Sequence, residues 1–175
     1  HQELQKICTA NIKNEIGKCT YTHMLNKDGG IETDLSVVCI DKNYFRIISS
    51  AATRERDKFH IKKHLSDATD LKDVTDDYCV LGLFGPKSRE LMTNISDEDF
   101  SNEKFKFGTA KYINVDEIII WTQRLSYVGE LGFELYVKIS DSIKLYELLM
   151  EKGKNYNISN CGMHAMDTMR MERGF

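Results

Sequence analysis

The sequence is poor in proline and has no long apolar run. Pro86 is the only proline among 175 residues. The longest fully apolar stretches, such as 118–121, are about four residues long, whereas a helix that spans a bilayer needs about twenty apolar residues. No basic segment followed by an apolar one opens the chain, so we expect neither a secretory signal nor a membrane partner.

The sequence also has no strong excess of positive or negative charge. The 24 basic and 27 acidic residues are interspersed and leave a net charge of -3. A protein that follows a phosphate backbone needs a broad positive surface. Nucleic acid is therefore not an expected partner.

The five cysteines show no C-x-x-C spacing, and one is left over after any pairing. This usage fits a reducing compartment and indicates small buried apolar side chains rather than a metal or redox site. His60 and His64 stand four apart in a predicted helix, but no third ligand lies nearby in the sequence. We therefore expect no metal.

The composition is that of a globular protein, with 41% apolar and 29% charged residues. The length suits about one domain, and no repeat or internal boundary is evident in 1–175. Because the chain starts at His1 rather than Met and stops at a helix end, we interpret it as a fragment of a larger protein.

Hairpin signals dominate the pattern. Alternating apolar segments separated by turn residues predict strands, and segments with helical spacing stand singly between the strand groups. The predicted strands are 19–25, 31–40, 44–48, 79–84, 109–114, 117–125 and 133–137. The predicted helices are an opening turn near residue 4 and segments 51–65, 86–93, 141–153 and 163–173. This order favours an α+β fold with a mostly antiparallel sheet and packed helices.

Two details of the helices can be predicted. Pro86 suits the start of a helix, and Asp141 suits a helix cap. In 51–65 charged residues dominate, so we expect a solvent-facing helix whose narrow buried stripe is made of Phe59, Ile61 and Leu65.

Three places carry polar groups that the strand pattern does not require. Asp34 follows the Gly29–Gly30 turn among apolar strand residues, where aspartate is disfavoured. Glu130 lies between two glycines in a loop, and Arg170 is a cation in a methionine-rich helix. From the pattern alone, Asp34 is also compatible with a structural acid at a strand end, Glu130 with a solvated hairpin residue and Arg170 with an exposed helical charge. No dinucleotide, phosphate-loop or nucleophile-elbow motif occurs.

Taken together, these places resemble one family, the folate-binding domain of aminomethyltransferases and of sarcosine and dimethylglycine dehydrogenases. Residues 21–35 (YTHMLNKDGGIETDL) are similar to its Y-x-x-M-L-N-x-x-G-G-I-x-x-D-L stretch, and 81–88 (LGLFGPKS) to its L-x-L-x-G-P segment. Residues 127–130 (YVGE) resemble its Y-T-G-E loop, and 162–172 (GMHAMDTMRME) its G-x-x-A-x-[DN]-x-[LM]-R-x-E helix. The whole chain, 1–175, is thereby identified as an aminomethyltransferase-like folate domain.

The resemblance implies a site for tetrahydrofolate. Asp34 is the expected catalytic residue, as general base or electrostatic stabiliser near the folate nitrogens. Glu130 is expected to accept hydrogen bonds from the pterin ring. Tyr21, Tyr127 and Arg170 complete the expected cofactor-binding set, with Arg170 pairing with a carboxylate of the folate or of the protein.

Within the family, 126–136 (SYVGELGFELY) is more like the dehydrogenases than the glycine-cleavage enzymes, and Thr33 points the same way. We therefore expect the domain to trap the one-carbon unit of an oxidised N-methyl amine as methylenetetrahydrofolate. The resemblance implies that FAD is bound by a flavin domain outside this chain. It also implies that the family's C-terminal barrel is outside this chain.

Two alternatives to this function remain. One is an aminomethyltransferase of the glycine cleavage system, and the other is a non-catalytic regulatory relative. The compartment implied by the resemblance is a bacterial cytoplasm or a mitochondrial matrix.

Overall fold

The computed structural model describes residues 1–174, and the chain forms two compact units, His1–Val74 and Thr75–Phe175. The sequence showed no sign of this boundary. Its physical reason is that the chain builds two separate apolar cores, one from side chains between Leu4 and Leu71 and one from side chains between Cys79 and Ile158.

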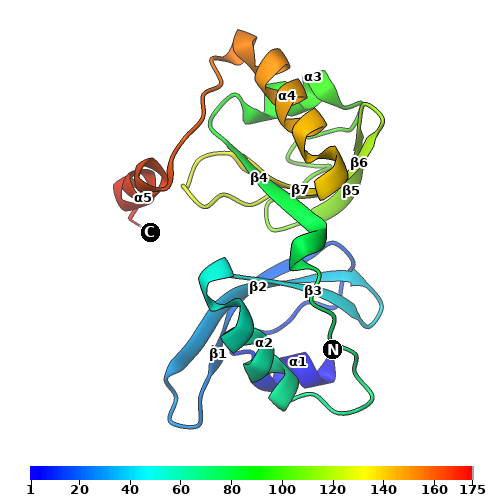
Figure 1. Ribbon diagram of the computed structural model, residues 1–175, viewed down its shortest axis with the longest axis vertical. Coiled ribbons are helices and arrows are strands. Elements are labelled where there is room, and N and C mark those ends of the chain that lie inside the picture. Colours follow the sequence, from blue (N-terminus) through cyan, green and yellow to red (C-terminus); the bar gives the residue numbers. More distant parts are fainter. Residues whose placement is uncertain (175) are drawn as a thin grey trace. The chain divides into compact units, whose positions relative to one another are not determined.

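The first unit is a three-stranded antiparallel sheet with two helices. Its strand order is β1-β2-β3. The elements are α1 (Gln2–Ile7), β1 (Cys19–Leu25), β2 (Ile31–Asp41), β3 (Tyr44–Ser49), η1 (Ala51–Thr53) and α2 (Arg54–Lys63). Figure 1 shows α1 and α2 on the same side of this sheet.

One face of this sheet forms the core of the first unit. Met24, Leu35 and Val37 pack there with Leu4 of α1 and Ile61 of α2. Because side chains alternate between the two faces of a strand, the residues between these positions point away from this core. The predicted hairpins are confirmed, with the register that the apolar alternation requires.

Helix α2 differs from the prediction at one position. Ile61 is buried and Leu65 packs against the core, but Phe59 is 72% exposed. At about 100° per residue, positions 59 and 61 lie on opposite sides of a helix, so both cannot face the sheet. The residue that shares the face of Ile61 is Asp57, four positions earlier.

Asp57 is a buried carboxylate that joins α2 to β2. The residue is only 2% exposed, and its Oδ2 accepts hydrogen bonds from Thr33 Oγ1 at 3.0 Å and from Thr53 Oγ1 at 2.6 Å. Buried carboxylates need such donors, because an unsatisfied one is costly. The Thr33 hydroxyl therefore holds β2 against α2 immediately beside Asp34.

The second unit is a four-stranded antiparallel sheet with helices. Its strand order is β4-β7-β6-β5. The elements are η2 (Thr75–Asp77), β4 (Tyr78–Phe84), α3 (Ser88–Ile95), β5 (Ala110–Val115), β6 (Ile118–Gln123), β7 (Gly132–Lys138), η3 (Ile139–Asp141), α4 (Ser142–Gly153), η4 (Lys154–Tyr156) and α5 (Met163–Glu172). Its core brings Met92 of α3 and Leu145 of α4 against Phe133 and Leu135 of β7.

Helix α5 is an exception within this unit. In Figure 1 it lies apart from α3 and α4, after an extended segment that follows η4. None of its ten residues, all within the described part of the chain, is buried. Its connection to the rest of the unit is therefore made by polar contacts rather than by a core.

The α+β fold class with antiparallel sheets is confirmed, although the strands form two sheets. Helix α3 begins at Ser88 rather than Pro86, because Gly85–Ser88 forms a turn closed by a 3.1 Å hydrogen bond from Ser88 N to Gly85 O. Asp141 occupies the N-cap position of α4, but its side chain makes no capping bond. None of the helices within residues 1–174 has the length and apolar character that a bilayer span requires.

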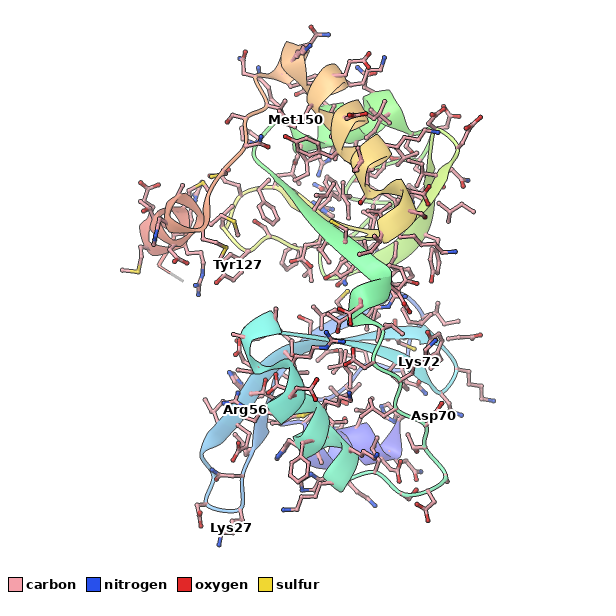
Figure 2. All side chains as sticks on the ribbon, in the orientation of Figure 1. Lys27, Arg56, Asp70, Lys72, Tyr127 and Met150 are labelled. Carbon is pink, nitrogen blue, oxygen red and sulfur yellow. The ribbon has the colours of Figure 1, made fainter. Side chains whose placement is uncertain are left out.

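Replacing Asp57 tests the join between α2 and β2. We expect Asp57→Ala to lower the free energy of unfolding by on the order of 2 kcal/mol, because it removes the acceptor of two hydroxyl groups. Asp57→Asn keeps one oxygen and should cost less. Urea unfolding followed by circular dichroism measures the change, with the exposed Asp70→Ala (Figure 2) as control. Equal unfolding midpoints for Asp57→Ala and Asp70→Ala would contradict this role.

Glu3 of α1 should make stability depend on pH in the acid range. Its carboxylate accepts hydrogen bonds from Ser66 N at 2.9 Å and from Thr69 Oγ1, and these bonds lower the pKa of Glu3 from 4.5 to about 2. Because the pKa is lower in the folded state, the stabilisation is complete above about pH 4.5 and is lost as the pH falls toward 2. The difference in unfolding free energy between wild type and Glu3→Gln should therefore shrink over that range, and a constant difference would contradict it.

Candidate functional site

Two of the predicted site residues meet on the first sheet. Tyr21 of β1 donates a hydrogen bond from its hydroxyl to Asp34 Oδ2 of β2 at 2.9 Å. Both side chains are exposed, whereas the neighbours of Asp34 in β2, Thr33 and Leu35, are buried. Asp34 therefore stands on the sheet face opposite the core, with a phenol to orient one of its oxygens.

His23 adds a third polar group to this face. It is the register partner of Asp34 across the β1–β2 pair. Its ring also meets the Tyr21 ring edge-on, with centroids 5.4 Å apart. The face therefore combines a carboxylate, a phenol and an imidazole.

The turn before Asp34 fixes its position along the strand. Asn26 Oδ1 accepts hydrogen bonds from Asp28 N at 3.0 Å and from Gly30 N at 2.8 Å. Gly29 has φ +81°, a conformation that suits glycine. A Cβ at Gly30 would lie 2.9 Å from Asn26 Nδ2. The double glycine thus lets the asparagine close the hairpin and set the register.

The other three predicted residues meet in the second unit, around the loop between β6 and β7. We call residues 126–131 the Glu130 loop. Arg170 of α5 donates from Nη1 to the Tyr127 hydroxyl at 2.8 Å, and its guanidinium carbon lies 4.3 Å from the centre of the Tyr127 ring. Arg170 Nη1 also lies 3.8 Å from Asp167 Oδ1. Figure 2 shows Tyr127 on the side of the loop that is nearest α5.

Glu130 has a cationic partner of its own. Its Oε1 pairs with Nη2 of Arg173, which follows α5 directly. Gly129 between these contacts has φ +73°, and a Cβ there would lie 2.7 Å from Arg173 Cγ. The glycine therefore gives the loop its turn and leaves room for the arginine stem.

Close packing at Gly132 determines where the loop ends and β7 begins. A Cβ at Gly132 would lie 2.3 Å from Phe84 Cδ1 and 3.1 Å from Leu125 O. Gly82, on the neighbouring strand, also faces the Phe84 ring. The aromatic ring thus fills the space of two missing side chains and holds β4 against β7.

A hollow of about 230 Å³ runs along the inside of the Glu130 loop. It is lined by Phe107, Arg124, Leu125, Ser126, Gly129, Glu130, Leu131 and Gly132. Ser126 Oγ is buried and has no hydrogen-bond partner among the described residues. The hollow therefore offers a carboxylate acceptor, a hydroxyl and an exposed aromatic ring, a set that suits a flat ligand with hydrogen-bond donors on one edge.

Arg124, which directly follows β6, anchors the start of the Glu130 loop by hydrogen bonds from its side chain. Its side chain is buried, and its guanidinium donates to Phe105 O and, at 2.6 Å, to Asn102 Oδ1. Arg89 Nη2 donates to the same Asn102 oxygen at 2.6 Å. Burial and the nearby Arg89 lower the pKa of Arg124, although an arginine stays protonated in proteins.

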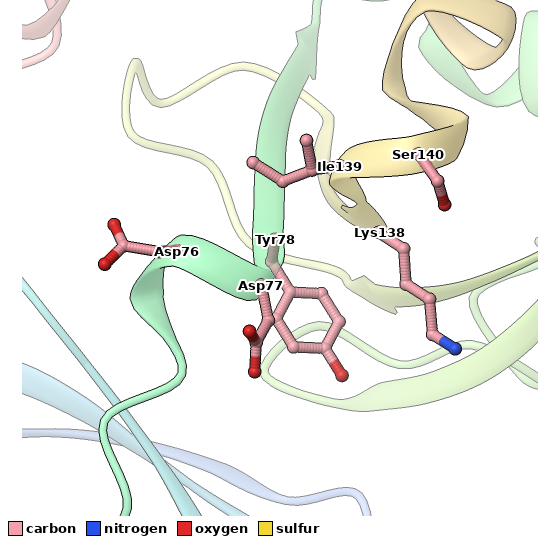
Figure 3. Close-up of a pocket in the computed structure, with 6 residues that line it drawn as sticks. All are labelled: Asp76, Asp77, Tyr78, Lys138, Ile139 and Ser140. Atoms are coloured by element: carbon pink, nitrogen blue, oxygen red, sulfur yellow. The ribbon is translucent and has the colours of Figure 1, made fainter.

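A second hollow of about 350 Å³ lies at the other end of β7 (Figure 3). Asp76, Asp77 and Tyr78 line one side, and Lys138, Ile139 and Ser140 line the other. Figure 3 shows the Asp76 carboxylate pointing away from the Lys138 ammonium group. None of the residues that the sequence singled out lies here.

No group of three or more His, Cys, Asp or Glu side chains that could hold a metal ion occurs among residues 1–174. The His60 and His64 rings lie 4.8 Å apart, and His64 Nδ1 is hydrogen-bonded to His60 O at 2.8 Å. None of the five cysteines forms a disulfide within residues 1–174.

The structure thus brings the five predicted residues together as two groups, Tyr21 with Asp34 in the first unit and Tyr127, Glu130 and Arg170 in the second. Sequence reasoning missed Arg173 and Asp57. Their spacing was a usable signal, because Arg173 lies three residues after Arg170, and Asp57 lies four residues before the apolar Ile61 on a helix.

Known proteins of two kinds are similar to this chain. It is 31% identical to an aminomethyltransferase from Halothermothrix orenii over 99% of this chain and 48% of that protein. It is 32% identical to human mitochondrial dimethylglycine dehydrogenase over 95% of this chain and 20% of that protein. The chain therefore spans about half the length of the first relative and a fifth of the second.

The fold has a solved counterpart in the glycine cleavage system aminomethyltransferase T from Bartonella henselae. The TM-score is 0.81 at 22% identity, over 99% of this chain and 46% of that one. The architecture is therefore of the aminomethyltransferase type. The chain belongs to the GCVT N-terminal domain family, whose model matches residues 1–175.

Gly132→Ala tests the packing that positions the loop. The new methyl group would overlap the Phe84 ring, and overpacking of this kind costs about 1–3 kcal/mol of unfolding free energy. Gly162→Ala is the matched control, because a Cβ at Gly162 meets open space. Equal urea midpoints for the two variants would show that Phe84 does not constrain the loop.

Proposed function

We propose that this chain binds tetrahydrofolate and catalyses the capture of a one-carbon unit on it, with Glu130 recognising the pterin ring and Asp34 acting on the reacting nitrogens. The observation that carries the proposal is that the two acids selected by the family resemblance each have a held position, Asp34 by a hydrogen bond from Tyr21 and Glu130 by an ion pair with Arg173. Tyr21 orients Asp34 directly, and Tyr127 stands in the Glu130 loop, where Arg170 holds it.

The hollow beside Glu130 suits a reduced pterin. The amino-pyrimidinone edge of a pterin presents neighbouring N–H donors, and a carboxylate can accept two such bonds in parallel. Phe107, which is exposed, and Ser126, whose hydroxyl is buried, border the same hollow. The aromatic ring provides a face for stacking, and the hydroxyl can donate to or accept from the ring edge.

Asp34 has the chemistry of a proton acceptor or an electrostatic stabiliser. Tetrahydrofolate supplies nitrogens that accept the one-carbon unit. A nitrogen that forms a new carbon bond loses a proton, and Asp34 is proposed to take that proton or to stabilise the developing positive charge. The Tyr21 hydroxyl occupies Oδ2 of Asp34, which leaves Oδ1 for this task.

We further propose that the carbon comes from an oxidised N-methyl amine such as sarcosine or dimethylglycine. Two observations support this branch: the 126–136 sequence, and Thr33, whose hydroxyl donates to the buried Asp57. A second acid at position 33, as in the glycine-cleavage branch, would place two carboxylates together in a buried site, which is unfavourable. In this branch FAD would serve the oxidation from a part of the protein outside residues 1–175.

The second candidate is an aminomethyltransferase of the glycine cleavage system, favoured by the 31% identity with the Halothermothrix orenii enzyme. The two differ in the carbon donor. Supplying the intact protein with tetrahydrofolate and either dimethylglycine or an aminomethyl-loaded lipoyl carrier decides between them. The donor that supports methylenetetrahydrofolate formation identifies the branch. In either case the compartment would be a bacterial cytoplasm or a mitochondrial matrix.

Two substitutions in the intact protein test the roles of the acids. Glu130→Gln should weaken tetrahydrofolate binding about tenfold or more, because hydrogen bonds to a charged group contribute about 1.5–3 kcal/mol. Asp34→Asn should leave binding nearly unchanged and lower turnover by about 10² or more, the range of a lost general base. Calorimetry gives the dissociation constants, and the rate of methylenetetrahydrofolate formation gives the turnover.

Matched controls are Glu172→Gln, an exposed glutamate of α5, and Asp28→Asn in the turn before β2. Both should behave as wild type. Binding by Glu130→Gln that equals wild type would refute ring recognition. Wild-type turnover in Asp34→Asn would refute its catalytic role, and binding without any turnover in the wild type would favour a non-catalytic relative.

A further inference from the structure

The contact between Arg173 and Glu130 goes beyond what the proposed function requires. Arg170 lies in the last turn of α5, and Arg173 follows the helix directly, three residues later, so the two side chains lie close to each other at this helix end. One holds Tyr127 and the other holds Glu130. Two residues of the Glu130 loop are thus tied to the C-terminal end of α5.

The ion pair with Arg173 restricts the rotation of the Glu130 side chain. A glutamate side chain loses conformational entropy when it is fixed in one rotamer. If the carboxylate is fixed before the ligand arrives, the ligand does not bear that cost. Glu130 is about one-third exposed and Arg173 about half exposed (33% and 52%), so the pair lies at the surface.

The geometry also leaves room for a ligand at the same carboxylate. Arg173 contacts Oε1 through a single nitrogen, Nη2. A carboxylate has about four acceptor positions on its two oxygens, so positions on Oε1 and Oε2 remain available. The arginine stem lies over Gly129, where a missing side chain lets it approach the loop closely.

We propose that Arg173 is a positioning residue: it orients the Glu130 carboxylate for the pterin before binding and does not itself touch the ligand. This inference rests on the proposed function, because it assumes that Glu130 binds the ring. It adds a residue, and through it the end of α5, to the machinery of the site. Since only one nitrogen makes the contact, a lysine at this position can preserve it.

The test compares Arg173→Met and Arg173→Lys in the intact protein, each with Glu130 and with Glu130→Gln. With Glu130 present, Arg173→Met should weaken tetrahydrofolate binding about three- to fivefold, the effect of losing an exposed ion pair. Arg173→Lys should bind nearly as wild type. In the Glu130→Gln background, Arg173→Met should change nothing further. Lys152→Met, a cation of similar exposure at the end of α4, is the control.

Hydrogen exchange without ligand provides an independent readout. Backbone amides of residues 126–131 should exchange faster in Arg173→Met than in wild type or Lys152→Met, because the loop loses one of its two ties.

The outcomes separate the two proposals. If Glu130→Gln weakens binding and Arg173→Met does not, the positioning role is wrong and the proposed function stands. Tighter binding by Arg173→Met would show that Arg173 competes with the ligand, which also overturns the inference. An equal loss from Arg173→Met in the wild-type and Glu130→Gln backgrounds would point to general damage and contradict it too. If wild type does not bind tetrahydrofolate, the proposed function fails, and the positioning role fails with it.

Discussion

The buried hydrogen bond between Thr33 and Asp57 is the constraint on which the first group of site residues depends. It fixes one residue of β2 on the covered side of the sheet, and strand alternation then forces Asp34 to the other side. A slip of one residue would exchange the two faces and bury the carboxylate of Asp34 instead. The apolar neighbour Leu35 supports the same register, so packing and hydrogen bonding agree on where the reactive acid stands.

The second group is positioned by a different principle. The Glu130 loop contains Gly129 and is followed by Gly132 at the start of β7. Each glycine makes room for a side chain from elsewhere, Arg173 at the first and Phe84 at the second. A loop between two strands is otherwise free to adopt many conformations. Here aromatic packing fixes its end and two arginines fix its middle. The carboxylate that the resemblance selects for ligand recognition is thus held by residues distant in the sequence.

Much of this could be predicted from the sequence, because the determining signals are local. Apolar alternation and the Asn26–Gly30 turn predict the first hairpin, and the predicted strands and helices are present with small shifts at their ends. The predicted start of α3 was wrong, because Pro86 lies in the turn before the helix rather than in the helix itself. The prediction that Phe59 is buried was wrong, because the position of a residue around the helix decides its burial, not its apolar character. The division into two units could not be predicted from the sequence, since no glycine- or proline-rich linker marks the boundary.

The site was predictable to the extent that a motif names its residues. Asp34, Glu130 and Arg170 stood out because their residue types are unusual in their settings, and the family match covers the whole chain. The spacing of Arg173 and Asp57 places them on helix faces, but it does not show what they contact, because Arg173 reaches Glu130 and Asp57 reaches Thr33 across elements separated by many residues. Such contacts depend on tertiary packing that a one-dimensional pattern does not contain.

Helix α5 has a further consequence. A ten-residue peptide helix in water is marginal, because the cost of its first turn is scarcely recovered over so few residues. Within the described chain α5 buries none of its side chains, and the contacts of Arg170 and Arg173 with Tyr127 and Glu130 join this helix end to the loop. Ordering of the helix and ordering of the loop are therefore thermodynamically coupled. A ligand that rigidifies the loop also stabilises the helix.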